Sequence, residues 1–188
     1  MFAMHFKKPV ATYQDILDLP EGVNGELIGG ELYTQSRPAN RHFRATTKLL
    51  VDLVNRFEDG IGGPGGWIFA FEPELRMSGN IFAPDIAGWR TERLPTIPDD
   101  THMALAPDWI CEILSPSTAS HDRLRKAHYY ARAGVPHLWL VDPQLKTLEV
   151  FRLVGEHYSL VQGAEGSETG RFEPFDAVEL ALQPWWIG

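Results

Sequence analysis

The sequence predicts an α/β (α+β) fold made of one domain over residues 1–188, with a mixed central β-sheet flanked by helices. The length of 188 residues, with 44% hydrophobic and 22% charged residues, is typical of one globular domain. Residues 108–114 and 137–142 are almost unbroken apolar runs, as expected of central strands covered on both faces. Between them, Ser120 begins a helical stretch that ends at Gly134.

The N-terminal third predicts a short helix, a β-hairpin and a longer helix. Thr12 and Asp15 have the spacing of a helix-capping pair. Residues 26–33 contain two apolar runs joined by Gly-Gly, which is typical of a hairpin. The longer helix is predicted from residue 40 to about residue 58, with one apolar face made of Phe43, Leu50, Val51, Val54 and Phe57.

Most of the remaining chain predicts strands separated by loops. Loops are expected at residues 60–66 and, because of three prolines, at residues 90–107. Strands are expected at residues 67–71, 74–77, 81–89, 108–114, 137–142, 147–153 and 157–162. The segment that ends in Trp185 and Trp186 shows no clear pattern.

Two predicted core strands each carry one carboxylate. Asp85 follows Pro84, which marks a bend or a strand edge. Glu112 lies between Cys111 and Ile113, and strand alternation places it on the opposite face from both. A buried ionised carboxylate is unfavourable by several kcal/mol unless it is compensated, so a shared divalent cation is one hypothesis. The plainer alternatives are a strand-end aspartate bonded to the backbone and a glutamate in a buried ion pair.

Lys126, His42 and Glu26 are further candidates for the same site. Asp122 and Lys126 lie four residues apart, which fits either an exposed helical ion pair or a lysine that points to the cleft and stabilises negative charge. His42 fits a metal ligand or proton carrier, or an ordinary surface histidine. Glu26 begins the hairpin, where a strand-edge charge is the alternative.

The net charge of −8 and the pI of about 5.3 argue against a strongly basic nucleic-acid-binding surface. The charge is uneven, however, because residues 155–188 hold six acids and one base. Basic residues gather around Arg41 and Arg44 and again around Arg123, where they fit either a local phosphate-binding surface or solvated helix faces.

The lone Cys111 excludes an internal disulfide and a cysteine-based zinc site, and it fits a reducing cytoplasm. No apolar run approaches the roughly 20 residues of a membrane span. The N-terminal lysines are not followed by an apolar run, so a secretory signal is not expected. A cytoplasmic protein is therefore predicted.

A series of ordered motifs between about Tyr13 and Leu160 resembles the Uma2 (DUF820) family. The motifs are Leu19-Pro20-Glu21-Gly22, Gly25-Glu26-Leu27-Ile28-Gly29-Gly30-Glu31-Leu32, Arg41-His42, Ala83-Pro84-Asp85, Glu112-Ile113-Leu114-Ser115-Pro116-Ser117-Thr118, Asp122 with Lys126, Tyr130-Ala131-Arg132-Ala133-Gly134-Val135-Pro136, and Trp139-Leu140-Val141-Asp142-Pro143. The family is assigned to the PD-(D/E)XK nuclease-like superfamily. The resemblance implies a restriction-endonuclease-like core.

The resemblance also implies that Asp85 and Glu112 are metal-binding acids. The superfamily usually has a lysine two residues after the second acid, but Leu114 stands there in this chain, and Lys126 is the implied substitute. Glu26 and His42 match positions that complete the site. A second departure is Gly29, where the family hairpin often carries aspartate.

The expected function is a Mg²⁺- or Mn²⁺-dependent endonuclease that acts on DNA, with Arg41, Arg44 and Arg123 holding the phosphate backbone. The alternative is a catalytically inactive nucleic-acid-binding or protein-binding module on the same fold. A homodimer is also expected, with an interface formed by the acidic segment after Gly155 and by Trp185-Trp186, since exposed aromatic side chains are unfavourable on a monomer.

Overall fold

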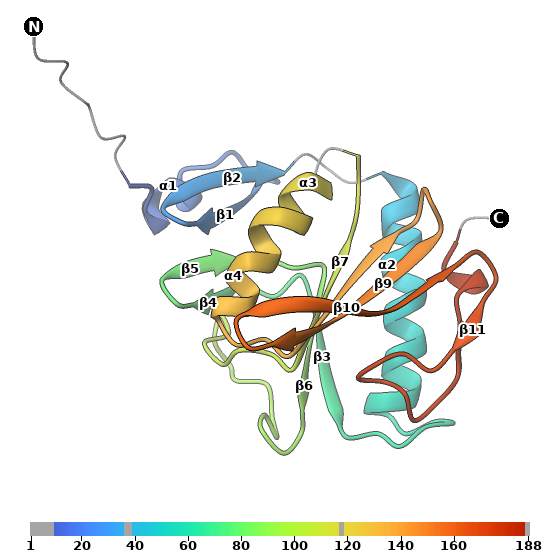
Figure 1. The fold of residues 1–188 in the computed structure, drawn as a ribbon. Coiled ribbons are helices and arrows are strands. Elements are labelled where there is room, and N and C mark those ends of the chain that lie inside the picture. Colours follow the sequence, from blue (N-terminus) through green and yellow to red (C-terminus); the bar gives the residue numbers. More distant parts are fainter. Residues whose placement is uncertain (1–9, 36–38, 117–118, 187–188) are drawn as a thin grey trace, which may run out of the picture.

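The computed structural model describes residues 10–35, 39–116 and 119–186 (Figure 1). Its largest element is a six-stranded sheet in the order β10-β9-β8-β7-β6-β3, in which β7 and β8 are parallel and all other neighbours are antiparallel. The strands are β3 (Trp67–Phe71), β6 (Ile86–Arg90), β7 (Trp109–Ile113), β8 (His137–Asp142), β9 (Thr147–Val154) and β10 (His157–Glu165). The predicted mixed sheet is confirmed.

A second, four-stranded sheet has the order β2-β1-β5-β4. It contains the predicted hairpin and two short strands: β1 (Asn24–Ile28), β2 (Glu31–Gln35), β4 (Leu75–Met77) and β5 (Asn80–Phe82). Beside it lies α1 (Tyr13–Leu17), whose predicted capping pair is confirmed because the Asp15 carboxylate accepts hydrogen bonds from the N–H and the hydroxyl of Thr12, at 2.6 and 2.8 Å.

The chain passes from the small sheet to the large one at Ala83-Pro84-Asp85. The single strand predicted over residues 81–89 is therefore two strands, β5 and β6, in different sheets. Pro84 has no N–H to donate to a ladder, which is the physical reason that the strand is interrupted here. The bend predicted at Pro84 is confirmed, and it brings Asp85 to the junction of the two sheets.

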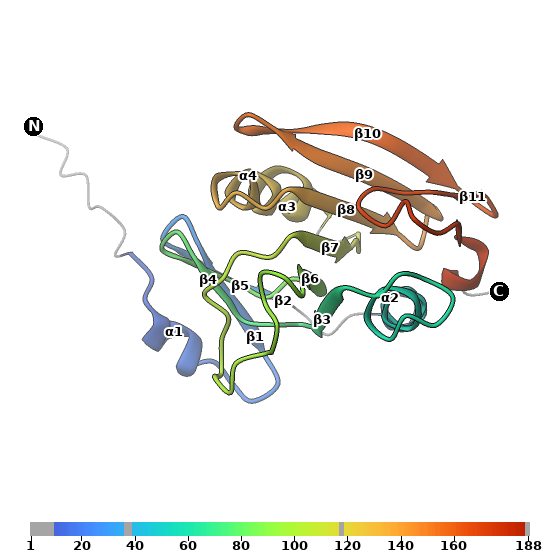
Figure 2. The ribbon, with the colours of Figure 1, turned by 90° about the horizontal axis from the view of Figure 1, so that it is seen from below.

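Helices cover the two faces of the large sheet (Figure 2). On one face lies α2 (Asn40–Leu53), which continues as the π-helix η1 (Val54–Glu58). Its predicted apolar face was partly wrong: Val51 is 51% exposed, whereas the buried positions are His42, Ala45, Thr46, Leu49, Leu53 and Phe57. Small and polar side chains therefore turn inward at the first turns of this helix.

The other face is covered by one continuous helical segment that connects the parallel strands β7 and β8, as such connections require. It consists of α3 (Ala119–His121), the π-helix η2 (Asp122–Lys126) and α4 (Ala127–Arg132). The π-helical turn carries both Asp122 and Lys126, and single π turns within helices are frequent at functional sites. In the part of the chain that is described, no helix is long and apolar enough to cross a membrane.

The C-terminal segment packs on the α2 side of the sheet. It contains β11 (Thr169–Gly170), β12 (Leu180–Ala181) and the 3₁₀ helix η3 (Gln183–Trp185). Trp185 and Trp186 are only 1% and 6% exposed, and Trp185 lies against Trp139 with ring centroids 6.3 Å apart. The expectation that these tryptophans form a dimer interface was wrong, because the chain itself buries them, and the reason for expecting a homodimer is removed.

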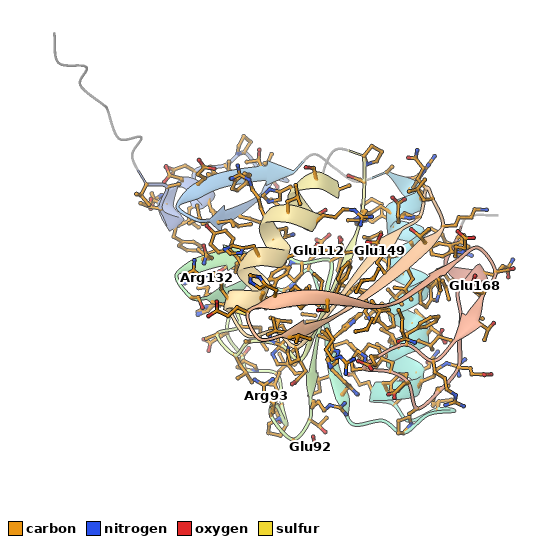
Figure 3. The ribbon with its side chains drawn as sticks, viewed as in Figure 1. Glu92, Arg93, Glu112, Arg132, Glu149 and Glu168 are labelled. Atoms are coloured by element: carbon orange, nitrogen blue, oxygen red, sulfur yellow. The ribbon has the colours of Figure 1, made fainter. Side chains whose placement is uncertain are left out.

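Of the charged side chains labelled in Figure 3, Glu112 lies within the molecule, whereas Glu92, Arg93 and Glu168 lie at its edge. Glu92, Arg93 and Glu168 are exposed, whereas Glu112 is 3% exposed inside the layer between the large sheet and α4. The candidate site is built around this buried glutamate.

Candidate functional site

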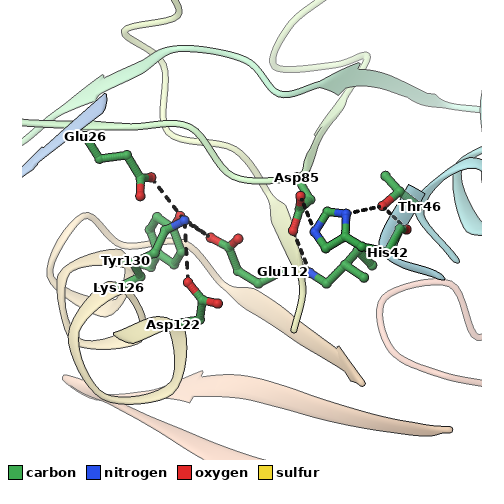
Figure 4. Close-up of polar contacts among 9 residues, drawn as sticks. Glu26, His42, Thr46, Asp85, Glu112, Asp122, Lys126 and Tyr130 are labelled. Carbon is green, nitrogen blue, oxygen red and sulfur yellow. Dashed lines mark hydrogen bonds and ion pairs between the residues drawn. The ribbon is translucent and has the colours of Figure 1, made fainter. Parts of the chain in front are cut away.

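Asp85 lies at the junction of the two sheets and is held from two sides. Its Oδ2 accepts a hydrogen bond from the main-chain N–H of Ile113 at 2.7 Å. Its Oδ1 lies 3.0 Å from Nε2 of His42, which comes from the first turn of α2 (Figure 4). The backbone contact was one of the plainer alternatives for Asp85, and the histidine contact brings together two residues that the sequence singled out separately.

Glu112 faces away from α2, as strand alternation predicts. Its neighbours Cys111 and Ile113 contribute to the core on the α2 side, while Glu112 points into the layer under η2 and α4. There its Oε1 lies 2.8 Å from Nζ of Lys126 and accepts a 2.6 Å hydrogen bond from the hydroxyl of Tyr130. Glu112 therefore forms the buried ion pair that was its plainer alternative, but the partner is one of the candidate site residues.

Lys126 lies among three carboxylates (Figure 4). Besides Glu112, its Nζ lies 3.0 Å from Oε1 of Glu26 on β1 and 3.8 Å from Oδ1 of Asp122 one turn earlier. The lysine side chain is 0% exposed and the three acids are at most 4% exposed. The exposed helical ion pair considered for Asp122 and Lys126 is therefore excluded, and Glu26 is not a solvated strand-edge charge.

Glu26 also binds the segment that carries Asp85. Its Oε1 accepts a 2.8 Å hydrogen bond from the main-chain N–H of Ala83, two residues before Asp85. The same oxygen faces Lys126, so Glu26 links the junction of the sheets to the π-helical turn. The four groups Glu26, Glu112, Asp122 and Lys126, called here the lysine cluster, form one connected buried unit.

The surplus of negative charge controls protonation in the lysine cluster. Burial lowers the pKa of Lys126, but the charges of Glu112, Glu26 and Asp122 outweigh this and raise it well above the usual value, so the ammonium stays charged. Burial raises the pKa of Glu112 well above 4.5, and the charge of Lys126 opposes this rise only in part. A raised pKa of both Lys126 and Glu112 is expected when three acids surround one base.

His42 is 7% exposed, which excludes the surface histidine considered from the sequence. Its Nδ1 lies 3.5 Å from the hydroxyl of Thr46, and that hydroxyl donates a 2.8 Å hydrogen bond to the carbonyl of His42. Burial lowers the pKa of His42, but the hydrogen bond to Asp85 and its charge more than offset this, so the pKa is raised above 6.5. The protonated ring and Asp85 then form an ion pair.

This raised pKa predicts a pH-dependent contribution to stability. His42 binds its proton more tightly in the folded protein, so its contribution is fully present below the ordinary pKa of 6.5 and is lost as pH rises through the raised value. We expect the free energy of unfolding of the wild type to fall, relative to that of His42→Gln, as the pH rises above 6.5. Urea denaturation in EDTA measures both proteins. Parallel pH profiles would show that the ion pair contributes nothing.

Glu72 is a residue of the site that sequence reasoning missed. It follows β3 with a φ of 45°, a left-handed conformation that is unfavourable by about 1–2 kcal/mol for a residue with a side chain. Its N–H donates a 3.1 Å hydrogen bond to the carbonyl of Asp85, and its half-buried carboxylate has a raised pKa, first because of burial and then because of the charge of Asp85. The sequence did contain a signal for Glu72. Like Asp85, it is an acidic residue next to a proline at the end of a strand.

The three arginines expected to hold phosphate are placed differently. Arg41 and Arg44 are exposed on the first turns of α2, at the same end of the sheet as the C-terminal end of β7 (Figure 1). Neither forms an ion pair with another residue of the described ranges. Arg123 instead forms an ion pair with Glu149 of β9 and lines a cavity between α4 and β10. The structure thus brings Arg41 and Arg44, but not Arg123, to the His42 side of the site.

The carboxylates of the site have the chemistry of ligands for a hard divalent cation. Mg²⁺ and Mn²⁺ prefer oxygen donors, and Mg²⁺ is commonly bound by one or two carboxylates together with water and substrate phosphate. Asp85 and Glu112 fit this pattern. Over residues 10–35, 39–116 and 119–186, no group of three or more His, Cys, Asp or Glu side chains is arranged to hold an ion.

Comparison with known proteins identifies the family. The model of the family Uma2, described as "Putative restriction endonuclease", matches residues 10–183. Among solved structures, the chain is similar to the crystal structure of a "putative nuclease belonging to DUF820" from Anabaena variabilis, with a TM-score of 0.74 and 21% identity, covering 94% of this chain and 97% of that chain. This likeness confirms the predicted fold. No curated protein matches the chain. Because the family match covers nearly the whole chain and agrees with the sequence motifs, the protein belongs to the Uma2 family.

Proposed function

We propose that this protein is a divalent-metal-dependent endonuclease that hydrolyses phosphodiester bonds of DNA. The observation that carries the proposal is the surplus of buried or half-buried carboxylates at the junction of the sheets. Five acids gather with two basic side chains: Glu26, Glu72, Asp85, Glu112 and Asp122 with His42 and Lys126. Such a surplus is unfavourable in a protein interior unless cations or protons compensate it. The family match supports a nuclease in particular.

Asp85 and Glu112 would hold one or two Mg²⁺ or Mn²⁺ ions. When bound, such an ion polarises the scissile phosphate and lowers the pKa of an attacking water. The other side chains act on these two acids. His42 fixes one oxygen of Asp85, and Glu26 holds the Ala83-Asp85 segment through the N–H of Ala83.

Lys126 is enclosed by carboxylates, so its contribution to the reaction is the placement of Glu112 and the positive potential that it adds near the scissile phosphate. Arg41 and Arg44 would contact the DNA backbone, because they are exposed beside His42. These contacts are local, and the net charge of −8 makes strong binding by the remaining surface unfavourable. Arg123, tied to Glu149, is left out of this proposal.

The test is cleavage of supercoiled plasmid DNA by the purified wild type. We expect nicked and linear products with Mg²⁺ or Mn²⁺ and none with EDTA. EDTA removes the divalent ion that would polarise the scissile phosphate and activate the attacking water. Equal cleavage in EDTA would contradict a metal-dependent mechanism. No cleavage of any tested DNA with either metal would contradict the nuclease proposal.

One observation favours the alternative of a catalytically inactive binding module on the same fold. The ammonium of Lys126 lies 2.8 Å from Glu112 and so competes with a cation for this carboxylate. Isothermal titration calorimetry separates the two functions. Absence of Mg²⁺ and Mn²⁺ binding at millimolar concentrations, together with DNA binding in EDTA, would favour the inactive module.

A further inference from the structure

Tyr130 is a fully buried residue to which the mechanism above gives no part. It lies on α4 at 0% exposure, with its ring against Phe82 at a centroid distance of 5.0 Å. Its hydroxyl donates a 2.6 Å hydrogen bond to Oε1 of Glu112. The packed ring leaves the hydroxyl little freedom to move, so it acts as a donor at a fixed place.

Two donors meet at the same oxygen of Glu112. Nζ of Lys126 lies 2.8 Å from Oε1, the atom that also accepts the bond from Tyr130. The second oxygen of Glu112 is turned to the side on which Asp85 lies (Figure 4). The carboxylate is therefore asymmetric, with one oxygen bound inside the protein and the other directed to the proposed cation site.

The hydroxyl is suited to a permanent role as donor. A tyrosine hydroxyl ordinarily loses its proton only near pH 10, so this donor keeps its proton near neutral pH. A glutamate has three side-chain torsions, and it loses conformational freedom only where other groups fix it. Lys126 shares its charge among three acids, whereas Tyr130 has a single proton and donates it to Glu112 alone.

We propose that Tyr130 is a positioning residue, which together with Lys126 holds Oε1 of Glu112 so that its second oxygen is the one that binds the divalent cation. This inference rests on the proposed function. Groups that orient a metal ligand typically change metal affinity by about 10- to 100-fold when they are removed. Tyr130 therefore acts through Glu112 and contacts neither the cation nor the DNA.

The test removes the hydroxyl alone. Tyr130→Phe is compared with Tyr158→Phe, because Tyr158 is also largely enclosed and its hydroxyl donates a 2.8 Å hydrogen bond to the carbonyl of Val135, away from the site. Mn²⁺ is titrated into each protein by calorimetry at 25 °C. We expect Tyr130→Phe to bind Mn²⁺ about tenfold more weakly than the wild type, and Tyr158→Phe to bind it unchanged.

Plasmid cleavage supplies a second measurement, which a purely structural role would not change in this way. Raising Mn²⁺ should restore the cleavage rate of Tyr130→Phe to the wild-type level, since the bound ion sits in the same site. Equal Mn²⁺ affinity of Tyr130→Phe and wild type would overturn this inference alone, as would a cleavage defect that saturating Mn²⁺ does not restore. Failure of the wild type itself to bind Mn²⁺ would overturn the proposed function and this inference together.

Discussion

Replacement of Asp85 by asparagine is expected to reduce Mn²⁺-dependent plasmid cleavage by about a thousandfold, equivalent to about 4 kcal/mol of transition-state stabilisation. The amide keeps the shape of the side chain and one oxygen that can still accept the hydrogen bond from Ile113. It lacks the negative charge that a divalent cation requires. The loss should therefore come from the chemistry of the site with little change in the fold, which circular dichroism would verify.

Asp108 supplies a closely matched control. It also precedes a core strand, and its two oxygens contact a main-chain N–H, that of Arg90 at 2.9 Å, and a basic side chain, that of Arg93 at 2.6 Å. The side chains of Asp85 and Asp108 have the same exposure, 14%. Asp108→Asn should retain wild-type cleavage. A similar loss in both variants would show that Asp85 matters only for stability, and full activity of Asp85→Asn would place the metal site elsewhere.

The largest effect on stability is expected from Lys126→Met. The substitution keeps much of the side-chain volume but leaves three buried carboxylates without their shared cation. Removal of one partner from a buried ion pair typically destabilises a protein by about 3–5 kcal/mol. For a protein of this length, that corresponds to a fall of roughly 6–20 °C in melting temperature. Differential scanning calorimetry in EDTA measures the change directly.

The pH dependence of this variant gives an internal check. Without the ammonium, Glu112, whose pKa burial already raises, binds its proton still more tightly in the folded protein, so lowering the pH should reduce the deficit in stability. Arg125→Met is the matched control, because Arg125 pairs with Glu31 at 3.0 Å while both side chains are at least half exposed. That pair should contribute less than about 1 kcal/mol. Equal shifts in the two variants would refute a special role of the lysine cluster.

Local sequence patterns were sufficient for the parts of the site that depend on one element. Alternation in β7 placed Glu112 on the correct face, and Pro84 marked the bend that brings Asp85 to the junction. Local patterns could not predict whether the side chain of Lys126 is buried or exposed. Four-residue spacing puts it on one face with Asp122, but only the packing of the whole helical segment decides whether that face is exposed or enclosed.

Two errors have a common cause. In α2 the sequence favoured the larger apolar residues, yet the helix turns Ala45 and Thr46 inward because the face is decided by what packs against it. Trp186, in a segment without periodicity, was expected at an interface, but the C-terminal segment packs it into the core. Glu72 was missed for the same reason, since the Glu72-Pro73 pair marks a strand end but reveals neither the left-handed backbone of Glu72 nor its contact with Asp85. In each case tertiary contacts override local preference.

The position of Glu26 has a consequence for how the protein opens. This residue belongs to the small sheet, yet its carboxylate pairs with a lysine carried by the helical layer on the large sheet. If the hairpin alone detached, Lys126 would lose its contact with Glu26 and the N–H of Ala83 would lose its acceptor. Partial opening is thereby disfavoured relative to complete unfolding. We therefore expect the two sheets to unfold as one cooperative unit, with the amide hydrogens of the hairpin exchanging with solvent mainly through global unfolding.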